Sequence, residues 1–407
     1  MTLAQRLLQT LSDQGGWMPF DQFMASALYE PGLGYYTSPR TTFGRMPDGR
    51  TTAAGAAQPG VMPAPLSEDQ SRAEVAPPAP VAVGSDFVTA PELSPLFGQT
   101  LARQVVQALQ ATGTREVWEF GAGSGALALQ ILEHVAQLEK AQGAQIIDRY
   151  TIVDLSGTLR ERQRATLAAF GSRVQWADRL PERMQGAVLG NEVLDAMPVK
   201  LLARVNGQWL ERGVVPAQAP AHFAWADRPT DLRPPVDIEG DHGVVTEIHP
   251  QAEGFMRTLA DRLERGAAFL IDYGFPESEY YHPQRSMGTL VCHHLHRMDD
   301  NPLVLVGEKD ITAHVNFTGV ALAAQEAGLD VLGYTSQARF LINCGLADLL
   351  QAQPDNAAGL AARSMAAKLI NEHEMGELFK VLAVAPPASA QDWVPMGFAA
   401  GDRTHTL

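Results

Sequence analysis

Two acidic residues stand three positions apart in the segment Asn191-Glu192-Val193-Leu194-Asp195, directly after a predicted strand. A turn at this place would put Glu192 and Asp195 side by side at the edge of a sheet. Paired carboxylates can bind two nitrogens of a guanidinium ion and leave its third nitrogen free to react. The sequence therefore predicts Glu192 and Asp195 as catalytic residues. The alternative is that Asn191 and Asp195 only shape the turn before Pro198.

A glycine-rich loop, Gly121–Gly125, follows the predicted strand Glu116–Phe120 and precedes a predicted helix over residues 126–140. Glycines let the backbone turn sharply and approach a ligand closely, and a helix N-terminus offers free N–H donors. In an open α/β sheet, ligands bind beyond the carboxyl ends of the strands. The residues that we predict to bind a cofactor here are Glu119, Gly121, Ala122, Gly123 and Gly125.

Acidic residues also follow the next two predicted strands. Asp154, with Leu155 beside it, comes after the strand Tyr150–Val153, where a carboxylate can accept hydrogen bonds from two ribose hydroxyls. Asp178 comes shortly after the strand 174–176 and is placed to accept a hydrogen bond from an adenine amino group. The alternative for Asp178 is a solvated loop acid or a helix cap. A glycine loop followed by a strand-end acid predicts a nucleoside-containing cofactor.

The same loop fits a degenerate dinucleotide motif, Gly121-x-Gly123-x-x-Ala126. Two features favour S-adenosylmethionine over NAD. Asp154 lies 28 residues beyond Ala126, whereas the acid of a dinucleotide site follows after about 20. More than a hundred residues also precede the loop, although this motif often opens an NAD domain. An NAD-dependent oxidoreductase remains the alternative.

The elements that position these residues alternate between strands and helices, which predicts an α/β, Rossmann-like fold with a largely parallel sheet covered on both faces. Residues 187–190 and 267–271 are the predicted fourth and fifth strands, and residues 380–384 are predicted as a closing edge strand. The predicted units are an N-terminal helical cap (1–43), a disordered insertion rich in Ala, Pro and Gly (44–83), the main domain (84–390) with inserted elements at about 200–265 and 275–320, and a C-terminal tail (391–407).

Composition limits the partners and the compartment. The chain has 46 acidic and 31 basic residues, a net charge of −15, which disfavours nucleic acid and favours cationic partners. No apolar run reaches the ~20 residues of a membrane span. The N-terminus does not resemble a secretory signal, and only Cys292 and Cys344 are present. We therefore expect a reducing, cytoplasmic environment.

Several motifs occur in the order found in one known family. They are Gly84–Gly98 (family pattern GDFxTAPExSxxFG), Glu119–Gly125, Asn191–Val199 (NExxDAxPV), Asp272–Gly274, Gly288–Leu290, Asp310–Val315 and Gly376–Leu382. The chain resembles the MidA-like family of class I S-adenosylmethionine-dependent methyltransferases from about residue 18 to 384. Two departures are Ser85, which interrupts Gly-Asp, and Asp154, where many members carry Glu.

The resemblance implies S-adenosylmethionine as the cofactor and an arginine of a protein partner as the methyl acceptor, with a subunit of respiratory complex I as one candidate. In this reading Thr89, Pro91 and Glu92 close over the cofactor, and Asn191 binds its methionine moiety or holds one of the acids. His314 is a candidate catalytic or substrate-binding residue, with a buried core histidine as the alternative. A non-enzymatic assembly factor that retains a cofactor pocket is the second rival function. The target protein and the oligomeric state stay open.

The segment Cys292-His293-His294-x-His296 has the residue types of a metal site. Adjacent residues alternate between the faces of a strand, and no second pair of Cys or His stands at metal-ligand spacing. We therefore predict no metal.

Overall fold

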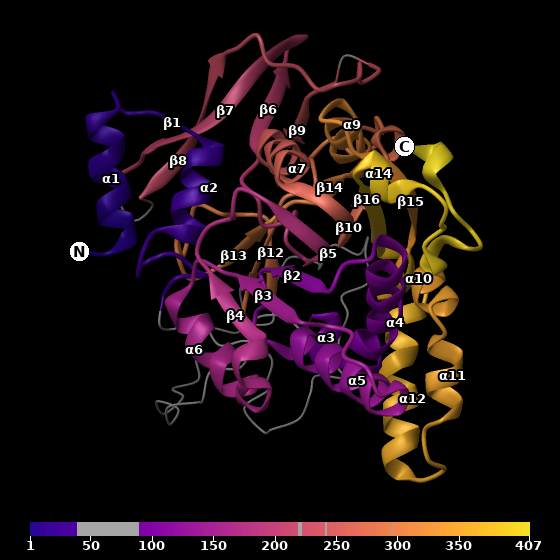
Figure 1. Cartoon of the computed structure of the whole chain (residues 1–407). Helices are drawn as coiled ribbons and strands as arrows, with labels where there is room; N and C mark the ends of the chain where they lie inside the picture. The colour runs from indigo at the N-terminus through magenta and orange to yellow at the C-terminus, as the bar shows by residue number, and fades with distance from the viewer. Residues whose placement is uncertain (39–88, 219–221, 241, 296) are drawn as a thin grey trace.

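The computed structural model describes residues 1–38, 89–218, 222–240, 242–295 and 297–407. Its centre is an eight-stranded sheet in the order β15-β16-β10-β5-β2-β3-β4, with β14 beside β10 (Figure 1). The strands are β2 (Glu116–Phe120), β3 (Arg149–Val153), β4 (Val174–Ala177), β5 (Met184–Asn191), β10 (Leu263–Phe275), β14 (Val315–Asn316), β15 (Asp330–Ser336) and β16 (Phe379–Ala385). Strands β4, β3, β2, β5 and β10 pair in parallel, whereas β16 is antiparallel to both β10 and β15. The predicted α/β fold with a largely parallel sheet is confirmed.

Helices cover both faces of this sheet because its strands are apolar on both sides. Within β2, Val117 packs into the core on one face and Trp118 into the core on the other, as the alternation of a strand requires. The first face carries α4 (Pro95–Thr112), α5 (Ala126–Gln142), α10 (Gln337–Asn343), α11 (Leu346–Gln351) and α12 (Ala357–Ile370), and the second carries α7 (Pro250–Arg262) and α9 (Phe317–Glu326). Further α-helices are α3 (Ala90–Leu93), α6 (Gly157–Thr166), α8 (Glu277–Tyr280), α13 (Met375–Leu378) and α14 (Pro387–Ala390).

A second, antiparallel sheet lies beside the first and joins distant parts of the chain. It contains β1 (Met18–Pro19), β6 (Lys200–Val205), β7 (Gln208–Pro216), β8 (Phe223–Pro229) and β9 (Val244–Ile248). The helices α1 (Leu3–Asp13) and α2 (Phe20–Tyr29) pack on it through a shared core. A small sheet of β11 (Val291–His294), β12 (Arg297–Asp299) and β13 (Asp310–Thr312) adds to the same core.

The helices predicted within the N-terminal cap are present as α1 and α2. Strand β1 between them pairs with β7, and the apolar faces of both helices are buried against the second sheet. The chain turns after α2, where the backbone N–H of Tyr35 donates to the Ala27 carbonyl at 2.9 Å. Residues 39–43, the predicted insertion over 44–83 and the start of the main domain at 84–88 lie outside the described residues.

Three further boundaries differ from the predictions. Strand β16 is not an edge strand, since β15 pairs with its outer side and all seven of its residues are buried. The inserted elements are shorter than the predicted ranges, because α7 and α9 belong to the core of the central sheet. The segment 391–407 is not a loose tail, since Phe398 is buried against Phe340 and Arg403 forms an ion pair with Glu377. Over the described ranges, we find no helix with the length and apolar character needed to cross a bilayer.

Candidate active site

A cavity of about 1030 Å³ opens at the carboxyl ends of β2, β3, β4 and β5. Residues from α2, α3 and α7 complete its wall, so that the N-terminal segment and the central sheet face one another across it. This volume is at the upper end of the range for small-molecule pockets, about 300–1,000 Å³. The cavity therefore has room for a nucleoside cofactor together with part of a second molecule.

The glycine loop forms one end of the cavity. Gly121, Gly123 and Gly125 all have positive φ, at 61°, 53° and 84°, a conformation that residues with a side chain seldom adopt. A Cβ added at Gly123 would meet no atom within 4 Å, so this part of the backbone is open to a ligand. Gly125 is the N-cap of α5, and the first N–H of the helix, from Ala126, donates to the Ser124 hydroxyl at 3.3 Å.

Helix α3 lies over the glycine loop. The Ser124 hydroxyl donates to the Glu92 carboxylate, and the Gln130 side chain of α5 donates to the Pro91 carbonyl at 2.7 Å. Thr89, Pro91 and Glu92 all line the cavity, as do Gly121, Ala122 and Gly123. The predicted segment thus lies where it could close over a cofactor, although its first part, residues 84–88, is not described.

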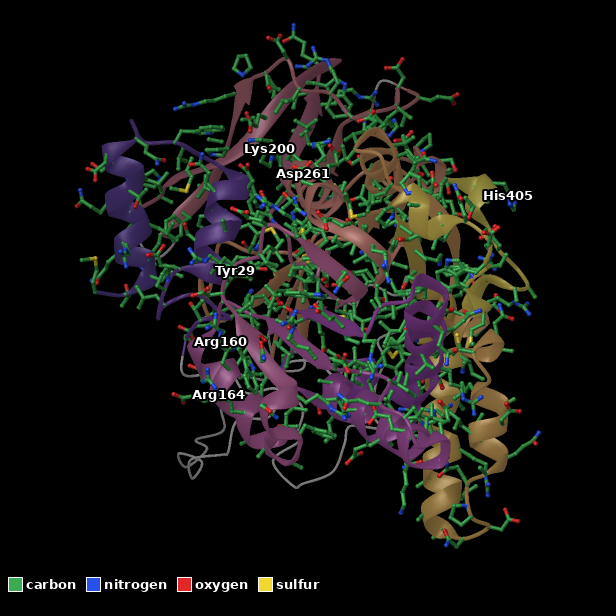
Figure 2. All side chains as sticks on the ribbon, viewed as in Figure 1. Tyr29, Arg160, Arg164, Lys200, Asp261 and His405 are labelled. Carbon is green, nitrogen blue, oxygen red and sulfur yellow. The ribbon has the colours of Figure 1, made fainter. Side chains whose placement is uncertain are left out.

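Asp154 lies at the end of β3 and is held from several sides. Its Oδ1 accepts from the Ser156 backbone N–H and its Oδ2 from the Gln163 side chain, each at 2.8 Å. Arg160, visible in Figure 2, donates from Nε to the Asp154 carbonyl at 2.7 Å. Each carboxylate oxygen has a second lone pair, so both can still accept from ribose hydroxyls. Burial raises the pKa of Asp154, and the hydrogen bonds from Ser156 and Gln163 counteract that rise.

The neighbouring predicted residues also reach the cavity. Leu155 lines it and is 69% exposed. Asp178 is exposed on the same rim. Glu119 is buried within β2, and its Oε2 accepts from the Tyr150 hydroxyl at 2.6 Å. Burial raises the pKa of Glu119 to about 7.

Asn191 and Glu192 line the cavity at the carboxyl end of β5. Glu192 has a φ of 53°, a strained value for a residue with a side chain, and strain of this kind is concentrated at functional sites. Its Oε1 accepts from the Asn191 side chain at 2.9 Å, and the first N–H of α3, from Ala90, also donates to the carboxylate. Burial raises the pKa of Glu192 to about 8, and the charge of Asp195 adds to the rise. The other side-chain atom of Asn191, Oδ1, has no partner among the described residues and can accept from a bound ammonium.

Asp195 is 4% exposed and lines the cavity next to Glu192. The Tyr273 hydroxyl and the Ala196 backbone N–H donate to its carboxylate, yet its Oδ1 has no hydrogen-bond partner among the described residues. Burial raises the pKa of Asp195 to about 6. A buried acceptor without a partner is costly, so this atom is suited to a donor that a ligand brings.

Asp272 was not among the predicted site residues, although its motif was recognised. It is 1% exposed and sits at the end of β10, where its Oδ2 accepts from the backbone N–H groups of Val193, Leu194 and Asp195 at 3.1, 2.9 and 3.3 Å. Burial, then the charges of Asp195 and Glu192, raise the pKa of Asp272 well above its usual range. Asp272 therefore positions the turn that carries both predicted catalytic acids. A buried-type strand that ends in an acid was the available signal.

Two tyrosines that were not predicted as site residues also line the cavity. Tyr29, the last residue of α2, and Tyr36 both line it, and their rings stack with centroids 5.5 Å apart at 22°. The Tyr29 hydroxyl donates to the Ala196 carbonyl at 2.9 Å, and the Tyr36 hydroxyl donates to Asp310 Oδ1 at 2.7 Å. No periodicity could reveal these contacts, because they join segments more than 150 residues apart.

His314 does not belong with these residues, which corrects its prediction as a catalytic residue. It is absent from the described residues that line the cavity. Its ring stacks on Phe275 with centroids 5.3 Å apart at 4° and meets Tyr273 edge-on. Burial, followed by the charge of Arg285, lowers the pKa of His314 to about 4. The alternative of a core histidine satisfied by hydrogen bonds is met only in part, because the residue is half-buried and its Nδ1 has no partner among the described residues.

Cys292, His293 and His294, which we predict not to bind a metal, lie on β11, where neighbouring side chains point to opposite faces. Cys292 is buried in the core beneath the second sheet, while His294 Nδ1 lies 2.7 Å from the Glu308 carbonyl oxygen. Among the residues that the structure describes, no group of three His, Cys, Asp or Glu side chains could hold a metal ion.

The side chains that line the cavity are mainly acidic. Among the described residues, seven carboxyl side chains line it (Asp21, Glu92, Glu119, Asp154, Asp178, Glu192 and Asp195), against a single basic side chain, Arg179. Such a lining favours cations, and S-adenosylmethionine carries a sulfonium and an ammonium group. The open glycine loop, the acid at the end of β3 and the unpartnered Asn191 Oδ1 together fit this cofactor.

Known proteins resemble the chain over most of its length. The family model described as "Putative S-adenosyl-L-methionine-dependent methyltransferase" matches residues 100–335. The mitochondrial protein arginine methyltransferase NDUFAF7 homolog of Drosophila melanogaster is 29% identical over 341 residues, covering 74% of this chain and 75% of that protein. Protein arginine methyltransferase NDUFAF7 of Mus musculus is 28% identical, with 74% of each chain covered.

A solved structure is more similar still. The crystal structure of a Burkholderia thailandensis protein bound to S-adenosyl-homocysteine is 48% identical, with a TM-score of 0.85, and the match covers 100% of this chain and 96% of that one. These matches support S-adenosylmethionine rather than NAD as the cofactor. Because the family model spans more than half of the chain and the cavity suits the same cofactor, the chain belongs to the MidA-like family of S-adenosyl-L-methionine-dependent methyltransferases.

Proposed function

We propose that this methyltransferase transfers the methyl group to an arginine side chain of a partner protein. The observation that carries the proposal is the pair of acids that line the cavity just after β5, Glu192 and Asp195, of which Asp195 leaves Oδ1 without a partner among the described residues. The relatives named as protein arginine methyltransferases support the same acceptor.

A guanidinium ion needs such acids in order to react. Its lone pair is delocalised and its pKa is above ~12, so it is a poor nucleophile in water. Asp195 can accept from one N–H and Glu192 from another, which holds the charge on two nitrogens and directs the third toward the methyl group. A lysine acceptor would have to lose its proton before attack, and two adjacent carboxylates would oppose that loss.

The proton balance also gives Glu192 a role. The cofactor, when bound, supplies a methyl group on a sulfonium. The attacking arginine nitrogen forms a bond to the methyl carbon, the carbon–sulfur bond breaks with its electrons moving to sulfur, and the nitrogen must release one proton. Glu192, whose pKa burial raises to about 8, can take that proton in its ionised form, which becomes the major form only as the pH reaches that value. Asp272 holds the turn in place during this exchange through its three backbone contacts.

The test is transfer of labelled methyl groups into a lysate from cells that lack this protein. The labelled band is hydrolysed, and its methylated amino acid is identified. We expect methylarginine, with no label from the Glu192→Gln/Asp195→Asn double variant, while the Tyr334→Phe variant, altered outside the cavity, retains activity. Label in lysine, in a carboxyl group or in nucleic acid would reject arginine as the acceptor, and no label in any macromolecule would favour a role without protein methylation.

The partner protein and the cellular location are two further parts of the proposal. A subunit of respiratory complex I is one candidate target, and identifying the labelled band tests it directly. A cytoplasmic location is proposed from the low cysteine content, and fractionation of the source cells would test it.

A further inference from the structure

The N-terminal segment supplies one wall of the catalytic cavity. Tyr29 lies at the end of α2 (Figure 2), and Tyr36 follows it in the turn after the helix. Both residues are only partly buried, and both line the cavity. The wall is therefore made by residues far in sequence from the cofactor loop.

Each tyrosine is attached to the catalytic turn or to its neighbour. The Tyr29 hydroxyl bonds the carbonyl of Ala196, the residue directly after Asp195. The Tyr36 hydroxyl bonds Asp310 of β13, and the nearby Ala313 backbone N–H donates to the Asp195 carbonyl at 3.0 Å. These bonds set the two rings at a defined place relative to the Asp195 carboxylate.

The rings are also ordered with respect to one another. The two stack at 22°, and Tyr35, which is buried, meets Tyr36 edge-on with centroids 5.0 Å apart. Nearby negative charge is considerable, since the charges of Asp310 and Asp195 both raise the pKa of Tyr29 after burial itself. An aromatic wall next to buried carboxylates suits a cation that is flat, because a flat cation can stack on a ring while its edge donates hydrogen bonds.

We infer that Tyr29 and Tyr36 form the acceptor subsite, in which the guanidinium plane of a substrate arginine stacks on the tyrosine wall while its edge donates to Asp195. This inference rests on the proposed function and adds the residues that distinguish arginine from lysine. A lysine ammonium is not planar and is more strongly hydrated, so it gains less from the same wall.

The first experiment measures binding of two small acceptor mimics to the chain saturated with S-adenosyl-homocysteine. The probes are Nα-acetyl-arginine amide and Nα-acetyl-lysine amide, titrated by NMR or calorimetry. We expect the arginine compound to bind more tightly. Equal affinity of the two probes, or no measurable binding of the arginine compound, would overturn the inference.

The second experiment separates the ring from the hydroxyl. Tyr29→Leu and Tyr36→Leu should each weaken binding of the arginine compound by about 5- to 30-fold, the range for a desolvated cation–π contact. Tyr29→Phe and Tyr36→Phe keep the ring and should retain most of the affinity. Affinity for S-adenosyl-homocysteine and the melting temperature serve as controls for folding. If the phenylalanine variants lose as much as the leucine variants, the tyrosines act through their hydroxyls and the stacked subsite is wrong.

The outcome for this subsite can be told apart from that for the proposed function. If labelled methyl enters an amino acid other than arginine, the proposed function fails whatever the tyrosine variants do. If methylarginine forms but both leucine variants bind the arginine compound like wild type, only the subsite fails.

Discussion

The carboxylate of Asp272 lies 2.9 Å from the backbone nitrogen of Leu194, and through this contact the end of β10 holds the turn that follows β5. The same oxygen accepts from Val193 and Asp195, so one side chain satisfies three consecutive N–H groups. Neither strand alone could orient the acids predicted to be catalytic. Their neighbouring positions in the parallel sheet, where Ile271 is paired with Asn191, bring the acid to the turn.

Removing the Asp272 side chain should therefore destabilise the fold and the site together. Asp272→Ala removes the acceptor of four backbone N–H groups, the three of the turn and that of Tyr273, which we expect to cost about 2–5 kcal/mol of unfolding free energy. Asp272→Asn keeps an acceptor oxygen and should cost less. Chemical denaturation measures both, and an unchanged midpoint for Asp272→Ala would show that the turn is held by other contacts.

Asp154 should matter for the cofactor. Asp154→Asn keeps the shape but removes the charge, and losing charge-assisted ribose hydrogen bonds at ~1.5–3 kcal/mol each should weaken S-adenosyl-homocysteine binding by 10-fold or more. Asp178→Asn, at an exposed position on the rim, should have a smaller effect. Calorimetry on the folded variants makes the comparison. Equal losses at the two positions would mean that burial of the acid is not what decides its contribution.

Glu192 should be needed for transfer and not for cofactor binding. Glu192→Gln should lower turnover on the order of 10²-fold or more, with S-adenosyl-homocysteine affinity nearly unchanged. Asp195→Asn should act in the same direction, and the double variant should lose less than the product of the two, because both acids hold one group. Loss of cofactor affinity in proportion to lost turnover would instead place Glu192 in the methionine pocket.

The pH dependence of the reaction follows from the raised pKa of Glu192, about 8. Below that pH the free enzyme holds Glu192 mainly protonated and unable to accept the proton released by the substrate. We expect kcat/KM to rise about tenfold per pH unit below the pKa and to level off above it. Glu192→Gln should give a low, flat profile, and a wild-type profile that falls between pH 6 and 8 would contradict this assignment.

The C-terminal segment should contribute to stability. Phe398 is 4% exposed and packs on Phe340 with ring centroids 5.5 Å apart, so Phe398→Ala should cost about 3–5 kcal/mol. Val394→Ala changes a side chain that is 65% exposed and provides the control, with an expected change near zero. Thermal unfolding of both variants gives the result, and similar melting temperatures would mean that residues 391–407 are a tail after all.

The sequence by itself determined the local elements that carry the cofactor site. The strand Glu116–Phe120, its glycine loop and the acid at position 154 were predictable because strand and helix periods, glycine and strand-end acids are encoded within about forty neighbouring residues. Ser156 was also predictable as a helix cap, and it accepts from the Leu159 N–H at 3.3 Å. Local patterns were sufficient there because the interactions themselves are local.

The part of the cavity lined by Tyr29 and Tyr36 was decided by the tertiary structure alone. These residues and Asp310 come near the turn after β5 only because β1 pairs with β7 and the second sheet brings α2 over the strand ends. The tertiary structure also decided the place of His314. Its motif indicated a functional role, whereas its ring packs between Tyr273 and Phe275 and is not part of the described cavity lining. Contacts across 100 to 280 residues depend on how sheets stack and which strands pair, and no local pattern in one sequence carries that information.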